Sequence, residues 1–279
     1  MRRQNGEGAL NPHPRLSVSG ICTRSLDLDG DLAFWAELGI DHVGIPVRKL
    51  EEAGWDIAVA RVAATGLRVS NLIAPSPFDL TAPGTWPERR DWLGRVLDAA
   101  TEIRAGCVVL TTGSPGDLQW EDAADRLRDA LGELVVDADQ RGTPVTLEHT
   151  NSLRSDISFV HTLRDAIDLA RSIGTRVCME VNACWLERGL GETVRAGVGM
   201  LALVQVSDLV SGTLDTPNRA VPGDGVIPLR RILGHVVGAG YPGPVDLEII
   251  GPRIESEGYE AAVRRSVMAV SALLAELGA

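Results

Sequence analysis

The chain has 279 residues, of which 44% are hydrophobic and 23% charged, and its formal net charge at pH 7 is −11. This length suits a single α/β barrel, whose usual size is about 250 residues. The acidic balance and the scattered Lys and Arg residues exclude a nucleic-acid partner. No apolar run approaches the roughly 18 residues that a membrane-spanning helix needs, so no membrane association is expected.

The first residues and the cysteines indicate the protein's environment. Residues 1–14 begin with a polar segment that lacks the apolar core of a signal peptide, and we expect a flexible tail there, before a single domain over 15–279. The cysteines show no paired metal-ligand spacing, which is typical of buried, reduced thiols in a cytoplasmic protein. The chain has four of them: Cys22, Cys107, Cys178 and Cys184.

Strand-like and helical patterns alternate along the chain. Short apolar, β-branched runs that follow turn residues predict strands, and longer amphipathic stretches predict helices. The expected strands cover 15–22, 41–46, 67–73, 107–113, the run ending at Glu148, 175–181, 201–208 and the run ending at Glu248. The expected helices cover 29–38, 50–65, 88–104, 120–140, 156–173, 227–239 and 258–277. A loop rich in Pro and Ser at 74–87 is long enough to be a lid.

This alternation, without an internal break in composition, predicts one (β/α)₈ TIM barrel. The alternative is an open, doubly wound sheet. Its dinucleotide-binding form would carry Gly-X-Gly-X-X-Gly after the first strand, and no such motif follows Val18-Ser19-Gly20-Ile21.

Two of the expected strands share a pattern and end on a glutamate. The segments GTPVTLE at 142–148 and GPVDLE at 243–248 each place a proline just ahead of a short strand and a carboxylate at its end. In a parallel barrel these ends open onto the active-site face, so we expect Glu148 and Glu248 to converge. The alternative for each is a solvated glutamate at a strand end.

The most specific motif of the chain is NRAVPGDGVI at 218–227, followed by GYPGPVDLE at 240–248. This order of a Gly-X-Gly turn, an apolar helix and a strand ending in Glu resembles the xylose-isomerase-like TIM barrels. That family includes sugar-phosphate isomerases, ketose 3-epimerases and inosose isomerases or dehydratases. The resemblance covers nearly the whole chain.

The resemblance implies one divalent ion held by Glu, Asp, His and Glu from the fifth to eighth strands. The two glutamates fall on Glu148 and Glu248, which are also the expected catalytic residues. The family Asp falls on Asn182, with Glu180 as a further candidate carboxylate, and the seventh-strand His falls on Gln205. An all-oxygen ligand set favours manganese or magnesium, and a metal-free site is the alternative.

The resemblance also bears on the substrate site. Trp185 falls where the family has a second His, and with Trp86 and Trp120 it suggests an aromatic-lined mouth. Arg219 matches a position that contacts the substrate in the family, the alternative being a solvated loop arginine, and Asn151 is a further candidate contact. A substrate less polar than a sugar phosphate is therefore expected.

The expected function is that of an isomerase or epimerase in which glutamates move a proton next to a carbonyl or polyol, with help from a divalent metal. A dehydratase or lyase of the same family is one alternative. Another is a metal-free barrel that binds a small molecule without this chemistry. The related DNA-repair endonucleases need a histidine-rich zinc cluster and a basic groove, and the sequence has neither. A small-molecule substrate is the expected partner, and a homo-oligomer is left open.

Overall fold

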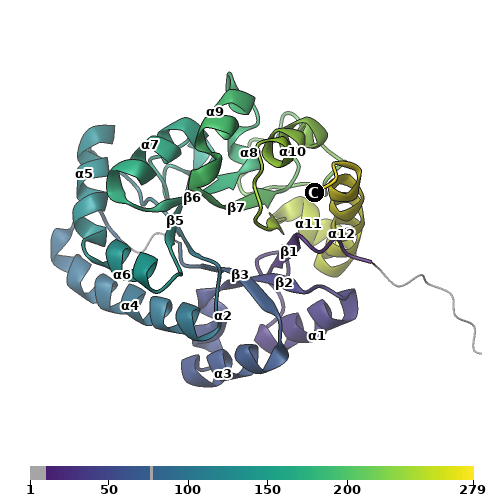
Figure 1. Cartoon of the computed structure of the whole chain (residues 1–279), viewed down its shortest axis with the longest axis horizontal. Helices are drawn as coiled ribbons and strands as arrows, with labels where there is room; N and C mark the ends of the chain where they lie inside the picture. Colours follow the sequence, from purple (N-terminus) through teal and green to yellow (C-terminus); the bar gives the residue numbers. More distant parts are fainter. Residues whose placement is uncertain (1–10, 76–77) are drawn as a thin grey trace, which may run out of the picture.

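Eight parallel strands close into a barrel in the computed structural model, which describes residues 11–75 and 78–279 (Figure 1). Each strand pairs with its neighbours in sequence, and β1 pairs with β8 to close the ring. The strands are β1 (Leu16–Ser19), β2 (His42–Pro46), β3 (Arg68–Ile73), β4 (Val108–Thr111), β5 (Val145–Glu148), β6 (Arg176–Glu180), β7 (Leu201–Val206) and β8 (Val245–Leu247). The single (β/α)₈ barrel predicted from the sequence is confirmed.

Helices surround the barrel as an outer ring (Figure 1). The α-helices are α1 (Leu28–Leu38), α2 (Val47–Glu52), α3 (Trp55–Thr65), α4 (Trp86–Glu102), α5 (Trp120–Leu131), α6 (Leu134–Gln140), α7 (Leu163–Ile173), α8 (Val181–Cys184), α9 (Leu190–Gly197), α10 (Leu229–Gly238), α11 (Pro252–Glu257) and α12 (Tyr259–Glu276). Short 3₁₀ turns are η1 (Pro83–Thr85), η2 (Ser152–Arg154) and η3 (Val198–Met200). None of the helices in the described parts of the chain is long and apolar enough to cross a membrane.

Three expected helices have different boundaries in the structure. The helix expected at 50–65 is split at Gly54, between α2, which ends at Glu52, and α3, which begins at Trp55. The helix expected at 120–140 is two helices, because α5 ends at Leu131 and Gly132 separates it from α6. The helix expected to begin at residue 156 begins at Leu163, where the Thr162 hydroxyl accepts the backbone N–H of Asp165 at 3.0 Å. Such a cap satisfies a backbone donor that has no partner within the helix, and so fixes where the helix starts.

Two expected segments fall partly outside the described residues. Of the tail expected at 1–14, only residues 11–14 are described, and the backbone N–H of His13 donates to Ser271 Oγ at 2.9 Å. Of the lid expected at 74–87, residues 76–77 lie outside the described residues. Around them Phe78, Leu80 and Trp86 are buried, so this part of the loop packs against the barrel.

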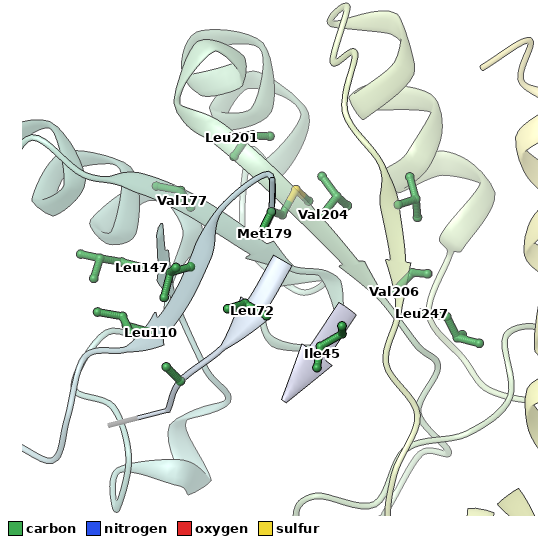
Figure 2. Close-up of a cluster of buried hydrophobic side chains, with 14 of the residues drawn as sticks. Ile45, Leu72, Leu110, Leu147, Val177, Met179, Leu201, Val204, Val206 and Leu247 are labelled. Atoms are coloured by element: carbon green, nitrogen blue, oxygen red, sulfur yellow. The ribbon is translucent and has the colours of Figure 1, made fainter. Parts of the chain in front are cut away.

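The main apolar core lies between the strands and the helices. Figure 2 shows part of it, with side chains from most strands, including Ile45, Leu72, Leu147 and Leu247. Side chains alternate along a strand, so the neighbours of these residues face the inside of the barrel. The interior holds a second, smaller apolar cluster: Cys107, Val109, Cys178 and Leu203. All four cysteines of the chain are buried and unpaired, as expected from the sequence.

The barrel interior also contains a polar network centred on Asp246. Ser17 Oγ donates to Asp246 Oδ1 at 2.5 Å, and Asn71 Nδ2 donates to Asp246 Oδ2 at 3.3 Å. Burial raises the pKa of Asp246 to about 7. Gly44 on β2 leaves the space for this contact, because a Cβ there would lie 2.9 Å from Asn71 Nδ2 and 3.2 Å from Asp246 Oδ2.

We expect Gly44→Ala to lower the free energy of unfolding by about 1–3 kcal/mol, because the added methyl group overpacks this network. Denaturant unfolding measures the change. Gly94→Ala on α4 is the control, since a Cβ there meets no atom within 4 Å. That variant should be neutral or more stable by up to about 1 kcal/mol. Equal stabilities for the two variants would contradict the packing argument.

Candidate active site

Three buried glutamates meet at the carboxyl ends of the strands. Glu148 ends β5, Glu180 ends β6 and Glu248 directly follows β8. One carboxylate oxygen of each lies within 4.8 Å of the others, and the side chains are 8%, 1% and 7% exposed, respectively. The structure therefore brings together Glu148 and Glu248, as expected, with Glu180 as the third member. We refer to these residues as the glutamate cluster.

Strand periodicity explains why these side chains point inward. The residues just before them, Leu147, Met179 and Leu247, belong to the core that Figure 2 shows between the barrel and the helices. On a strand the next side chain points to the opposite face, which in a barrel is the interior. The register of β6 and β7 pairs Glu180 with Gln205, which places that glutamine beside the cluster.

Arg219 is the cation that faces the cluster. Its Nη1 lies 3.0 Å from Glu180 Oε1 and donates to Ser207 Oγ at 3.0 Å. The arginine side chain is 14% exposed, so the solvated loop arginine considered from the sequence is wrong. Burial alone would lower the Arg219 pKa, but the charges of Glu180 and Glu248 outweigh it and raise the pKa. The guanidinium therefore stays charged.

Asp208 holds the loop that carries Arg219. Asp208 Oδ2 accepts the backbone N–H groups of Gly223 and Gly225 at 2.9 and 3.1 Å. A Cβ on Gly225 would lie 2.2 Å from Asp208 Oδ1, so only glycine fits there. Asp208 also forms an antiparallel bridge with Ala220, next to Arg219. The PGDG segment of the sequence thus folds around a carboxylate and orients the arginine.

The other two glutamates are held in their protonated form near neutral pH. Burial, followed by the charge of Glu180, raises the pKa of Glu148 to about 8. Burial and the charges of Glu148 and Glu180 raise the pKa of Glu248 well above its usual range. Carboxyl groups with such pKa values can both accept and return a proton, which a reversible proton carrier must do.

Gln205 joins the site through its amide nitrogen. Gln205 Nε2 donates to Glu248 Oε2 at 2.6 Å, and the Cys178 thiol donates to Gln205 Oε1 at 3.1 Å. Burial raises the pKa of Cys178 well above its usual value, so the sulfur keeps its proton and acts as the donor. In this arrangement the amide oxygen faces Cys178, and not the cluster as expected for a metal ligand.

Asn182 lies just beyond the sixth strand. The strand expected at 175–181 ends at Glu180, and Asn182 belongs to α8. The Asn182 backbone N–H donates to Glu180 Oε1 at 2.8 Å, and Nδ2 donates to the Asp208 carbonyl at 3.3 Å. The carboxylate that β6 contributes is therefore Glu180. The signal in the sequence was that this strand, like β5, ends on a glutamate.

The remaining candidates lie around this centre. Asn151 Oδ1 accepts the backbone N–H of Leu153 at 2.9 Å and so caps η2. Trp185 is partly buried and lines a groove between α9 and α10 with residues that include His235. The indole of Trp86 is buried, and Trp120 packs edge-on against a phenylalanine. The sequence also predicted that a substrate contacts Asn151, Trp185 and Arg219, and this remains a prediction.

His149 is a site residue that the sequence did not indicate, although it directly follows Glu148. It is fully buried, and its Nε2 accepts the backbone N–H of Glu180 at 3.3 Å. Burial lowers its pKa to about 3, so the ring is neutral and carries its proton on Nδ1. His149 thus ties the end of β6 to the residue after β5.

The donor set of the cluster fits a hard divalent cation. If a cation displaced the protons of Glu148 and Glu248, the three carboxylates and the Arg219 guanidinium would together carry a formal charge of −2. Glu180 Oε2 is buried and has no hydrogen-bond partner within the described part of the chain. Carboxylate oxygens at such close range are the ligands that Mg²⁺ and Mn²⁺ prefer. Glu148, Glu180 and Glu248 are therefore the residues that could hold a metal.

Comparison with known proteins identifies the family. The xylose isomerase-like TIM barrel family matches residues 32–268, and the chain belongs to it. A search of curated protein sequences gave no match.

Several solved structures share the fold. Protein SMc04130 from Sinorhizobium meliloti 1021 is 22% identical, with 91% of this chain and 96% of that one covered and a TM-score of 0.84. The IolI protein, solved with a zinc atom, is 18% identical, with 94% and 99% covered and a TM-score of 0.81. D-psicose 3-epimerase from Clostridium cellulolyticum H10, solved with D-tagatose, is 16% identical, with 94% and 99% covered and a TM-score of 0.76.

The raised pKa of Glu148 predicts how stability depends on pH in protein freed of divalent ions with a chelator. The ordinary pKa is 4.5 and the folded-state pKa is about 8, so the folded state holds the proton more tightly. This contribution to stability is fully present below about pH 4.5 and is lost as the pH rises through about 8. We expect the free energy of unfolding to fall between these limits.

Denaturant titrations at several pH values test this expectation. Glu148→Gln should make the fall with pH shallower, whereas Glu102→Gln, which changes an exposed carboxylate at the end of α4, should leave it as in the parent. Identical slopes for the parent and the Glu148→Gln variant would show that Glu148 titrates normally.

Proposed function

We propose that this protein is an isomerase or epimerase that moves a proton next to a carbonyl or polyol of a small molecule. The observation that carries the proposal is the cluster of three buried glutamates, whose carboxylate oxygens lie within 4.8 Å of one another at the strand ends. This is the face at which TIM barrels carry their active sites. The epimerase and the zinc-containing IolI protein among the similar structures agree with this chemistry.

Glu148 and Glu248 are the proposed proton carriers. Both are buried, both have raised pKa values, and they approach the cluster from different strands. One can take the proton from the carbon beside the carbonyl while the other returns it. Glu180 forms an ion pair with Arg219, which stabilises its ionised form. We therefore assign Glu180 a role in binding and not in proton transfer.

The other polar groups orient the substrate. A manganese or magnesium ion held by Glu148, Glu180 and Glu248 would polarise a substrate oxygen. Arg219 presents a permanent positive charge to the same space, and the Gln205 amide holds one oxygen of Glu248 in place. Burial of these groups excludes water, which strengthens their interaction with a substrate oxygen.

A second candidate is a barrel that binds a small molecule without a metal. Two contacts favour it, since the Arg219 guanidinium already pairs with Glu180 and the Gln205 N–H group already occupies an oxygen of Glu248. A dehydratase is a variant of the leading proposal, in which a protonated glutamate assists the loss of hydroxide.

Metal binding distinguishes the metal-assisted enzyme from the metal-free binding barrel. We expect the parent protein to bind Mn²⁺ in calorimetric titrations, and Glu180→Gln to weaken binding about tenfold or more, because it removes one charged ligand. Asn182→Ala should change the affinity little, since the Asn182 side chain donates to the Asp208 carbonyl, and its backbone N–H, which donates to Glu180 Oε1, is kept in the variant. Glu102→Gln on the surface is the control. Absence of Mn²⁺ binding in the parent protein would favour the metal-free candidate.

Proton transfer is tested by exchange of substrate hydrogen with deuterium from the solvent, followed by NMR over a panel of ketoses and cyclic keto-polyols. We expect Glu148→Gln and Glu248→Gln each to fold normally and to slow exchange by about 10²–10⁴-fold, the usual contribution of an acid or base. Glu102→Gln should exchange at the parent rate. Near-parental exchange in either cluster variant would remove that residue from the proton path.

A further inference from the structure

The face that carries the glutamate cluster has a second feature. A cavity of about 490 Å³ opens beside the ends of β1, β2, β3 and β8. Its walls are largely apolar, with Ile21, Val47, Ile73, Ala74 and Ile250 among the lining residues. The size is that of a small-molecule site.

Arginines dominate the charge of this cavity. Arg24 follows β1, Arg48 lies on α2 and Arg89 lies on α4, so three separate elements contribute an exposed arginine to the lining. Glu51 is the single acidic side chain in the lining. This positive concentration occurs in a chain with a formal net charge of −11, where chance would favour acidic linings.

Two of these arginines have no acidic partner in the described residues. Arg48 pairs with Glu52, one turn further along α2. No ion pair within residues 11–75 and 78–279 involves Arg24 or Arg89. Their positive charge is therefore free to meet a ligand.

An aromatic ring is fixed at the same rim. Trp92 Nε1 donates to Glu51 Oε1 at 2.7 Å, which orients the indole, and the Arg89 guanidinium lies 5.7 Å from the ring centroid. The one acidic residue of the cavity thus holds the tryptophan and does not neutralise an arginine directly. An oriented indole beside apolar side chains favours a flat or apolar molecular body.

The cavity and the glutamate cluster share a wall. Ile250 lines the cavity, lies just beyond Glu248 in the chain, and accepts the backbone N–H of Arg219 at 2.8 Å through its carbonyl oxygen. The segment after β8 therefore borders both the glutamate cluster and the cavity on one barrel face.

We propose that this cavity binds the anionic group of the substrate, and that the substrate is a small acid with a flat or weakly polar body. The inference rests on the proposed function, because it assigns the substrate class of the same barrel mouth. Guanidinium groups recognise carboxylate and phosphate through paired, charge-assisted hydrogen bonds, so both anions share the required chemistry. A neutral sugar would gain nothing from these charges.

The test uses simple probes on the full chain. Benzoate, phenyl phosphate and the neutral isostere benzamide are titrated against the protein while the arginine Nε–Hε and backbone amide NMR signals are followed. We expect at least one anion to shift the signals of Arg24, Arg89 and Ile250, with benzamide binding more weakly. A preference for benzoate or for phenyl phosphate identifies the anionic group.

Arginine variants locate the binding. The double change Arg24→Gln with Arg89→Gln should weaken anion binding about tenfold, as expected for the loss of charged hydrogen bonds. Arg126→Gln removes an exposed arginine on α5 outside this cavity and should leave the affinity unchanged. Equal affinity for benzamide and the anions, or full binding by the double variant, would overturn the proposal.

The proposal can fail independently of proton transfer. Anion binding is also measured in Glu248→Gln, which keeps the cavity arginines, and it should match the parent. If hydrogen exchange is observed on a neutral ketose while no anion binds, the substrate assignment is wrong and the proposed reaction stands. If anions bind and no acidic or neutral substrate exchanges hydrogen, the reaction is wrong and the anion site stands.

Discussion

Mutual repulsion among three buried carboxylates is the constraint on which the rest of the site depends. Glu148, Glu180 and Glu248 cannot all ionise within a few ångströms of each other without a nearby cation, because little water reaches them. Two features reduce this repulsion. The buried guanidinium of Arg219 pairs with Glu180, and the pKa values of Glu148 and Glu248 are raised, so that these two groups keep their protons. The same balance leaves room for a divalent cation, which would replace the two protons.

Polar side chains around the cluster hold this arrangement in place. His149 accepts a backbone N–H at the end of β6, Gln205 bridges Cys178 and Glu248, and Asp208 gathers the loop that carries Arg219. Each of them satisfies a buried polar group at the strand ends, where the barrel hydrogen-bond ladder stops. Deeper in the barrel, Asp246 is satisfied in the same way by Ser17 and Asn71. Hydrogen bonds therefore fix the residues around the glutamate cluster and those deeper in the barrel.

The two halves of the barrel mouth differ in charge. β5, β6 and the residue after β8 contribute the three glutamates, and the segments after β1 and β2 together with α4 contribute arginines around an apolar cavity. Such a division suits a substrate that is held at one end and reacts at the other, since binding energy far from the reacting atoms can position them. Membership of the xylose isomerase-like TIM barrel family gives the fold.

The sequence by itself determined the barrel, because strand and helix periodicity are local and their alternation admits few topologies. It also singled out Glu148 and Glu248, since each closes a short strand introduced by proline. It offered both Asn182 and Glu180 as the contribution of the sixth strand, because the residue at which a strand leaves its ladder depends on its neighbours, here Gln205 and the backbone cap of α8. Only the tertiary structure decided that Arg219 is buried against Glu180 and that three arginines share a cavity. Those contacts join residues far apart in the chain, and the closure of the barrel brings them together.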